Sequence, residues 1–251
     1  MPATPAWPPK SAPRLFVDQA LEEGAQVPVE GNQAHYLAKV MRVAAGDAVI
    51  LCDDRTGEWA TSVVLADRRQ VTLAVERRLR PREDVPDFWL CPAMLKKDRF
   101  DLVLEKATEL GVAVIQPVLT RRCVADKLNA DRANAIVTEA AEQCARTALP
   151  QVARLARLDA LLREWPQDRT LFFADEEGGE PAAAAFREAR GAAALLTGPE
   201  GGFDDSERSA IRAHPCARPI TLGPRILRGE TAAIAATAIW MAQAGDWGGG
   251  E

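Results

Sequence analysis

The chain has 251 residues, of which 47% are hydrophobic and 27% charged, and its formal net charge is −5. This composition is ordinary for a globular protein with a buried core. No apolar run reaches the roughly 18 residues that a membrane-spanning helix needs. The proline-rich start lacks a continuous apolar stretch and does not resemble a secretory signal. We therefore expect no membrane contact and a cytoplasmic location.

Residues that several enzyme classes require are missing. Five cysteines lie far apart without a C-x-x-C pair, which favours free thiols in a reducing compartment. Only two histidines are present, which argues against a zinc site, and we expect no metal. The G-x-S-x-G elbow of many serine hydrolases is also absent.

Basic residues are distributed unevenly along the chain. Residues 1–82 contain 11 Lys and Arg against 10 Asp and Glu, whereas residues 83–251 contain 20 against 26. One arginine cluster consists of Arg68, Arg69, Arg77, Arg78, Arg80 and Arg82. Such a cluster can meet phosphates, because screening makes nearby charges matter most. A solvated charged rim explains it equally well.

The first part of the chain is typical of a small β-barrel. Short strands are predicted at residues 15–17, 25–29, 48–52, 59–65 and 71–77. One helix interrupts them, with Asn32 as its cap and with Tyr36, Val40 and Val43 on its apolar face. We assign residues 1–80 to this domain and residues 81–251 to a second one.

The second part alternates strands and helices, which predicts an α/β domain with a parallel sheet covered on both faces. Strands are expected at residues 88–93, 112–119, 170–174, 193–197 and 218–222. Helices are expected at residues 100–110, 131–148, after Asp204 and at 230–244. Asp204 and Glu207 have the spacing of a capping box.

Two segments follow strands and enter helices, the position where ligands bind in α/β sheets. The first, residues 195–203, reads LLTGPEGGF, and its glycines allow a ligand to approach the backbone closely. It matches neither the Walker loop nor G-x-G-x-x-G, so nucleotide-phosphate binding is the weaker interpretation. A tight turn without a ligand is the structural alternative.

The second segment, residues 220–232, reads ITLGPRILRGETA. Arg228 stands at a helix start, where the helix dipole favours anions. A residue that violates a local rule is a functional candidate. The alternative is a surface ion pair of Arg228 with Glu200 or Glu230.

Both segments resemble the RsmE-type family, the 16S rRNA (uracil-N3)-methyltransferases of the SPOUT superfamily. GPEGGF followed by LG-x-x-ILR-x-ETA carries the resemblance. HYLAKVMR at residues 35–42, KATELGV at 106–112 and EAAEQCAR at 139–146 with Pro150 agree with it. These five motifs occur in the expected order, and the resemblance as a whole spans about residues 14–243.

The resemblance implies a PUA-like RNA-binding barrel and a SPOUT α/β domain with a deep trefoil knot. It also implies S-adenosylmethionine as the cofactor, 16S rRNA of the small ribosomal subunit as the partner, and a homodimer. The expected cofactor-binding residues are Phe173, Ala174, Leu196, Thr197, Gly198, Pro199, Glu200, Gly201, Leu222, Gly223, Ile226, Leu227 and Thr231. Asp175 and Glu176 follow Phe173 and Ala174 at the end of their strand and are expected to line the same cofactor pocket.

The expected RNA contacts are His35, Arg42, Arg77, Arg78, Arg80, Gln143 and Arg146. For His35 a structural role in the barrel is an equal alternative. Gln143 and Arg146 fall on the more polar side of the helix predicted at 131–148, and a contribution to the RNA-facing pocket has the same weight as an ordinary polar position on that helix. Lys106 and Glu109 fit a surface ion pair better than a functional role.

Two positions depart from the family pattern. Gly229 replaces a frequent Thr, and Arg121 replaces a frequent acid. We expect neither to touch the glycine loop.

The implied reaction requires loss of the imide proton from uridine N3. We expect Arg228 to stabilise the resulting anion, and Glu230 or Glu200 to be the candidate proton acceptor. Two rival hypotheses remain open: a noncatalytic RNA-binding assembly protein that retains the fold, and an α/β enzyme acting on a small nucleotide.

Overall fold

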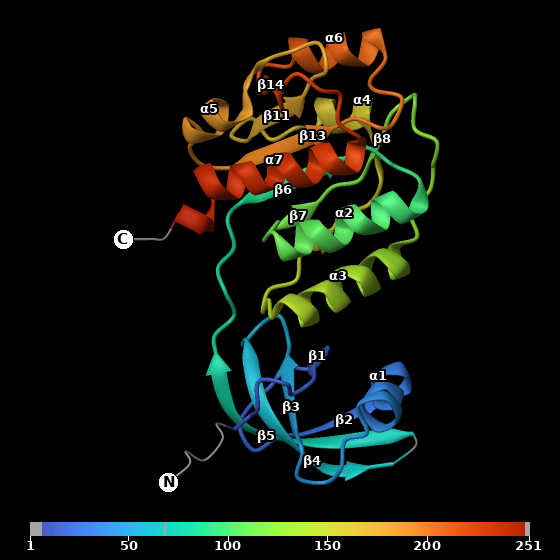
Figure 1. Cartoon of the computed structure of the whole chain (residues 1–251), viewed down its shortest axis with the longest axis vertical. Helices are drawn as coiled ribbons and strands as arrows, with labels where there is room; N and C mark the ends of the chain where they lie inside the picture. The colour runs from blue at the N-terminus through green and yellow to red at the C-terminus, as the bar shows by residue number, and fades with distance from the viewer. Residues whose placement is uncertain (1–6, 68, 249–251) are drawn as a thin grey trace. The chain divides into compact units, whose positions relative to one another are not determined.

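The chain divides into two units in the computed structural model, which describes residues 7–67 and 69–248 (Figure 1). The first unit contains the chain up to Asp84 together with Ala141–Ala148. The second contains Val85–Ala140 and the chain from Leu149 onward. Residues 141–148, assigned to the second domain from the sequence, thus pack with the first unit. No helix in the described ranges is long and apolar enough to cross a bilayer.

The first unit is built on a five-stranded sheet with the order β1-β3-β4-β5-β2. Its strands are β1 (Arg14–Phe16), β2 (Gln26–Glu30), β3 (Ala48–Cys52), β4 (Glu58–Ala66) and β5 (Gln70–Arg80). β1 pairs in parallel with β3, and the other pairings are antiparallel. All five strands were expected. Alternate residues such as Val27, Leu51 and Leu73 form its buried core.

The single helix of this unit differs from the sequence prediction. Helix α1 (Gly31–His35) continues as a π-helix, η1 (Tyr36–Met41), and its N-cap is Glu30. Asn32 therefore lies inside the first turn, and its predicted capping role is wrong. The wider π-turn also changes which residues face the sheet: Leu37 is buried, whereas Val40 is 62% exposed.

The second unit contains a seven-stranded parallel sheet with the order β12-β14-β11-β13-β6-β7-β9. Its strands are β6 (Phe88–Pro92), β7 (Val114–Ile115), β9 (Gln151–Val152), β11 (Thr170–Ala174), β12 (Glu180–Pro181), β13 (Ala193–Thr197) and β14 (Ala217–Thr221). A small separate sheet pairs β8 (Val118–Leu119) with β10 (Ala156–Arg157). The predicted strand at 112–119 is therefore two strands, interrupted at Pro117, which has no N–H to donate.

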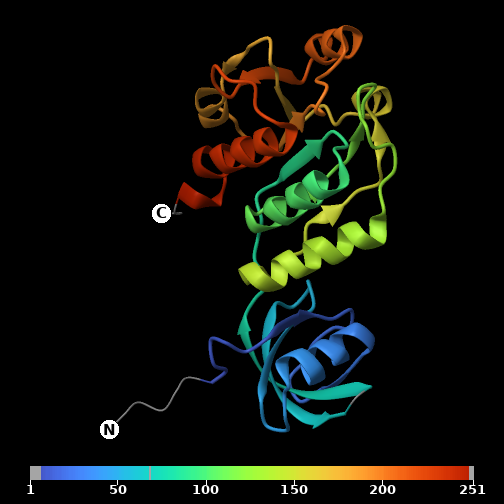
Figure 2. The same ribbon diagram turned by 45° about the vertical axis from the view of Figure 1, so that its right-hand side comes forward.

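Helices cover both faces of this sheet (Figure 2). They are α2 (Lys97–Glu109), α3 (Ala130–Cys144), α4 (Leu158–Arg163), α5 (Ala182–Arg187), α6 (Asp205–Ala213) and α7 (Gly229–Gln243), followed by the 3-10 turn η2 (Asp246–Gly248). The four helices expected from the sequence are present. α3 ends at Cys144 instead of residue 148, because Ala145 turns to a φ of 60°.

The two faces have separate cores. α2, α5 and α7 contribute to one, where Trp240 stacks on Phe88 with ring centroids 4.1 Å apart. α4 and α6 contribute to the other, against Leu171 and Leu196. The parallel strands β14, β11 and β13 are direct neighbours, so their carboxyl ends lie side by side at one edge.

Candidate active site

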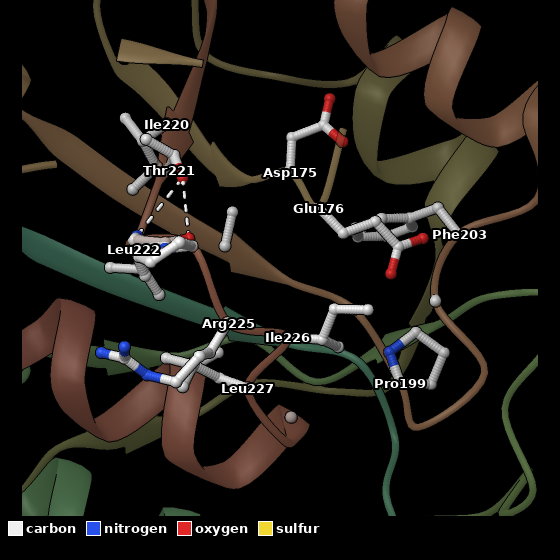
Figure 3. A pocket seen from close by; sticks show the side chains of 17 residues that line it. Asp175, Glu176, Pro199, Phe203, Ile220, Thr221, Leu222, Arg225, Ile226 and Leu227 are labelled. Atoms are coloured by element: carbon white, nitrogen blue, oxygen red, sulfur yellow. Dashed lines mark hydrogen bonds between the residues drawn. The ribbon is translucent and has the colours of Figure 1, made fainter. Parts of the chain in front are cut away.

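Three loops that leave these strand ends enclose a cavity of about 130 Å³ (Figure 3). β11 ends in Ala174 and is followed by Asp175 and Glu176. The loop after β13 contributes Gly198, Pro199, Gly202 and Phe203. β14 and its loop contribute Ile220, Thr221, Leu222, Gly223, Pro224, Arg225, Ile226 and Leu227, and Gly229 and Ala232 of α7 complete the lining.

Glycines allow the loops to approach one another in the cavity wall. Gly202 has a φ of +67°, and a Cβ there would lie 2.8 Å from Glu176 Oε1. Gly223 has a φ of +105°, which side-chain-bearing residues rarely adopt. Figure 3 shows Ile226 between Leu222 and Pro199, and its side chain is 85% exposed. The cavity therefore offers an uncovered apolar surface beside backbone that a ligand can approach closely.

Two carboxylates at the end of β11 differ in their surroundings. The Asp175 side chain is fully buried, and it accepts hydrogen bonds from Arg208 Nη1 at 2.6 Å and Arg212 Nε at 2.9 Å. Glu176 accepts one from Arg208 Nη2 at 2.7 Å but stays 42% exposed. Asp175 is thus neutralised by two arginines of α6, whereas Glu176 keeps polar surface facing the cavity.

The start of α6 fixes the end of the glycine loop. Asp204 accepts a hydrogen bond from the Glu207 N–H at 2.8 Å, and Glu207 Oε2 accepts one from the Asp204 N–H at 3.2 Å. The predicted capping box is therefore confirmed. The Glu207 N–H, the Ser206 hydroxyl and Arg121 lower the pKa of Asp204 to about 2.

Seven of the thirteen expected cofactor-binding residues line the cavity: Ala174, Gly198, Pro199, Leu222, Gly223, Ile226 and Leu227. Phe173 and Leu196 instead point into the core beneath α4 and α6, because side chains alternate across a strand. Thr197 is buried at the end of β13. Glu200, Gly201 and Thr231 adjoin the lining without being part of it.

Sequence reasoning missed several lining residues. Gly202 and Phe203 belong to the GPEGGF motif, so the motif itself was a usable signal. Thr221, Arg225 and Ala232 lie within the second segment, residues 220–232, but were not among the expected cofactor contacts. Their position depends on the path of the backbone after β14, which periodicity does not report.

Glu200 and Glu230 are joined by an arginine that sequence reasoning did not single out. Arg99 Nη1 lies 3.4 Å from Glu200 Oε1, and Arg99 Nε lies 3.7 Å from Glu230 Oε1. Arg228 is exposed and finds no side-chain partner among the residues that the structure describes. The alternative in which Arg228 pairs with either carboxylate is therefore wrong.

Of the two departures from the family pattern, Gly229 lies against the glycine loop, contrary to expectation, whereas Arg121 contacts the residue that follows the loop. A Cβ at position 229 would lie 3.0 Å from the Gly198 carbonyl oxygen and 2.8 Å from Leu95 Cδ2. Arg121 Nη1 contacts Asp204 Oδ2 at 2.9 Å, directly after the loop. The next residue, Arg122, donates from Nη1 to the Gly201 carbonyl at 3.1 Å.

The expected RNA contacts in the first unit fall into two groups. His35, Arg42, Arg77, Arg78 and Gln143 are exposed. The exposure of His35 does not support a packing role in the barrel. Arg69 is exposed as well, and Arg68 lies outside the described residues.

Arg80 and Arg146 make contacts within the first unit. Arg80 Nε contacts Glu58 Oε2 at 2.6 Å, and its Nη2 donates to the Ala145 carbonyl. Arg146 is 5% exposed, and burial lowers the pKa of its guanidinium. Arg146 departs from the expectation of an open RNA-facing side chain, because residues 141–148 pack with the first unit, whereas the Arg80 side chain stays 41% exposed. Lys106 Nζ contacts Glu109 Oε1 at 2.8 Å, which confirms that surface pair.

Known proteins resemble both units. Residues 82–241 match the model of an RNA methyltransferase domain, and residues 29–76 match that of an RNA methyltransferase PUA domain. The ribosomal RNA small subunit methyltransferase E of Synechocystis sp. is 32% identical over 90% of this chain and 76% of its own.

Two solved structures share the fold. A ribosomal RNA small subunit methyltransferase E from Neisseria gonorrhoeae, bound to S-adenosyl methionine, has a TM-score of 0.84 and 27% identity. A methyltransferase from Legionella pneumophila with the bound cofactor SAM has the same TM-score and identity. Each match covers 94% of this chain and 99% of the other. The chain therefore belongs to the RNA methyltransferase family, among the S-adenosylmethionine-dependent ribosomal RNA small subunit methyltransferases E.

Proposed function

We propose that this protein transfers a methyl group from S-adenosylmethionine to N3 of one uridine in 16S rRNA, in the decoding region near the 3′ end. The observation that carries the proposal is the cavity at three adjacent strand ends, formed by the loops that hold GPEGGF and ILR-x-ETA. We further propose that it acts in the cytoplasm, where this substrate is made. The trefoil knot stays a prediction from the resemblance.

The cavity residues fit the cofactor chemically. Leu222, Ile226 and Leu227 offer apolar walls for the adenine ring, and the glycine-rich backbone leaves room for close approach. The half-exposed carboxylate of Glu176 suits the ribose hydroxyls or the ammonium group. When bound, the cofactor supplies an electrophilic methyl group on a sulfonium.

Arg228 is the proposed anion stabiliser. Uridine N3 becomes nucleophilic only when its imide proton leaves, and the charge then spreads over O2 and O4. A guanidinium near these oxygens lowers the barrier, because it stabilises charge that develops in the transition state. Arg228 follows a cavity residue, Leu227, and is exposed, so its charge is available to a substrate.

Glu200 and Glu230 remain the candidate proton acceptors. Each has a buried Oε2 without a hydrogen-bond partner among the described residues. Their Oε1 atoms face Arg99.

A homodimer through the second unit is also proposed, supported by the composition of α7. Ile234, Ala235 and Ala238 are only partly buried and lie outside the core that α7 forms with its own sheet, so the helix keeps apolar surface beyond that face. Trp240 does not belong to this surface, because it is 3% exposed and stacked on Phe88.

Calorimetry followed by methyl transfer separates the proposal from its rivals. We expect binding of S-adenosylmethionine and S-adenosylhomocysteine, no binding of ATP, and transfer of a labelled methyl group to small-subunit particles. RNA binding without cofactor binding would indicate a noncatalytic assembly protein. Binding of ATP without the methyl donor would indicate a small-nucleotide enzyme.

A further inference from the structure

The contacts of Arg99 join three segments that are distant in sequence. Arg99 lies in the first turn of α2, Glu200 in the loop after β13, and Glu230 in the first turn of α7. The guanidinium contacts Glu200 through Nη1 at 3.4 Å and Glu230 through Nε at 3.7 Å. The neighbouring Lys96 N–H donates to Glu200 Oε1 at 3.3 Å. The start of α2 thus holds both carboxylates.

These carboxylates flank the place where two walls of the cavity meet. Glu200 stands directly after Pro199, and Glu230 directly after Gly229, and both preceding residues line the cavity. Gly229 approaches the Gly198 carbonyl so closely that a Cβ would be 3.0 Å from it. A shift of either carboxylate therefore moves a cavity wall.

Arg99 compensates the negative charges of Glu200 and Glu230, which lie close to one another. The side chains of Glu200 and Glu230 are only 19% and 12% exposed, and the described residues give neither a second ion pair. Two poorly hydrated carboxylates near one another repel when the shared cation is removed. The loops that carry them would then separate.

We propose that Arg99 is a positioning residue for methyl transfer. By holding Glu200 and Glu230, it fixes the glycine loop against the start of α7 and so shapes the cofactor cavity. Arg99 does not line that cavity and acts only through the two carboxylates. The inference rests on the proposed binding of S-adenosylmethionine there.

The test compares Arg99→Gln and Arg99→Lys with a matched control, Arg132→Gln. Arg132 also makes an ion pair with α2, through Asp101, but that pair lies away from the cofactor cavity. We expect Arg99→Gln to weaken S-adenosylmethionine binding about 10-fold or more. Turnover should fall about 10²-fold, the loss typical of a misplacement of roughly 1 Å. Arg99→Lys should recover only part, because one ammonium cannot reproduce the planar fork.

A double-variant cycle distinguishes positioning from general stability. Arg99→Gln combined with Glu230→Gln removes one of the two repelling charges, so its cofactor affinity should exceed that of Arg99→Gln alone. Equal affinities would show that the charges are not coupled through Arg99 and would overturn the proposal. So would an Arg99→Gln enzyme that matches the Arg132→Gln control in affinity and turnover, even with a lower melting temperature.

An unfolded variant and a failure of the proposed function can each be distinguished from a failure of this inference. If Arg99→Gln does not fold, Arg99→Lys and Glu230→Gln carry the same comparison, and wild-type affinity in both would overturn the proposal. If the wild-type protein itself does not bind S-adenosylmethionine, the proposed function fails first.

Discussion

Gly229 lies against Gly198: a Cβ on the first would stand 3.0 Å from the carbonyl oxygen of the second. This approach joins the start of α7 to the glycine loop, and both residues line the cavity. The Leu95 side chain occupies the space on the other side, 2.8 Å from the same Cβ position. A glycine at this position thus allows Leu95 and the glycine loop to pack together.

Gly229→Ala tests this contact. The added methyl group should push on the Gly198 carbonyl and weaken cofactor binding, at a cost of about 1–2 kcal/mol, as expected for overpacking. Adding Leu95→Ala should restore part of the affinity, because one of the two close contacts disappears. Isothermal calorimetry measures both. If Gly229→Ala binds the cofactor with wild-type affinity, the close contact with Gly198 is not needed for cofactor binding.

Reversing Arg77 and Arg78 to Glu tests the RNA surface. Both side chains are exposed, so the protein should stay folded and bind cofactor normally. If each arginine contacts one phosphate, the slope of the logarithm of the RNA-binding constant against the logarithm of the salt concentration should become less negative by roughly 0.7–0.9 per lost contact. An unchanged slope would assign the two arginines to a solvated rim.

Glu58→Ala tests the structural role found for Arg80. Glu58 is buried and contacts Arg14 Nη2 and Arg80 Nε, each at 2.6 Å. Its removal should lower the free energy of unfolding by about 2–3 kcal/mol, near the low end for buried pairs because both arginines are partly exposed. Urea unfolding of the full chain measures this. A loss below about 0.5 kcal/mol would contradict the role.

Alkylation near pH 8 should sort the cysteines by burial. Burial raises the pKa of Cys52 and of Cys91 to about 12, so hardly any thiolate forms at these positions. Cys144 is exposed and should react first. Mass spectrometry of tryptic peptides reads the order. Early labelling of Cys91 would contradict the described packing of β6.

Arg228→Ala tests the proposed anion stabiliser. Folding and cofactor affinity should remain nearly intact, whereas turnover should fall about 10²–10³-fold, the range for loss of one oxyanion-type donor. The deficit should shrink at high pH, where more uridine is already deprotonated. Arg228→Lys should recover activity only in part. Lost cofactor binding with normal turnover at saturation would make Arg228 a pocket residue.

A dimer through α7 predicts a mass near twice the 27.2 kDa of one chain in light scattering at micromolar concentration. Ile234→Asp should shift the distribution toward the monomer, because it places a charge on the partly buried apolar surface of α7 that lies outside its own core. A wild-type monomer at that concentration would refute the proposed dimer.

Local signals in the sequence predicted much of this fold, and distant contacts account for what they missed. The capping box of Asp204 and Glu207 was readable because its partners are three residues apart. The contact between Arg99 and Glu200 could not be predicted in this way, because the two residues are 101 positions apart along the chain. Similarly, Arg146 was expected on a polar helix face, but the segment that carries it packs back into the first unit. The prediction that Val40 lies on the apolar face of its helix was wrong for another reason: a π-turn cannot be recognised from the periodicity of apolar residues.

The identity of the methylated atom decides whether the protein modifies N3 of uridine. Small-subunit particles should be incubated with the protein and S-adenosylmethionine, and the 16S rRNA then digested and its nucleosides resolved by mass spectrometry. We expect 3-methyluridine, absent without enzyme and strongly reduced with Arg228→Ala. A methyl group on ribose or on a base other than uracil would contradict the proposed function.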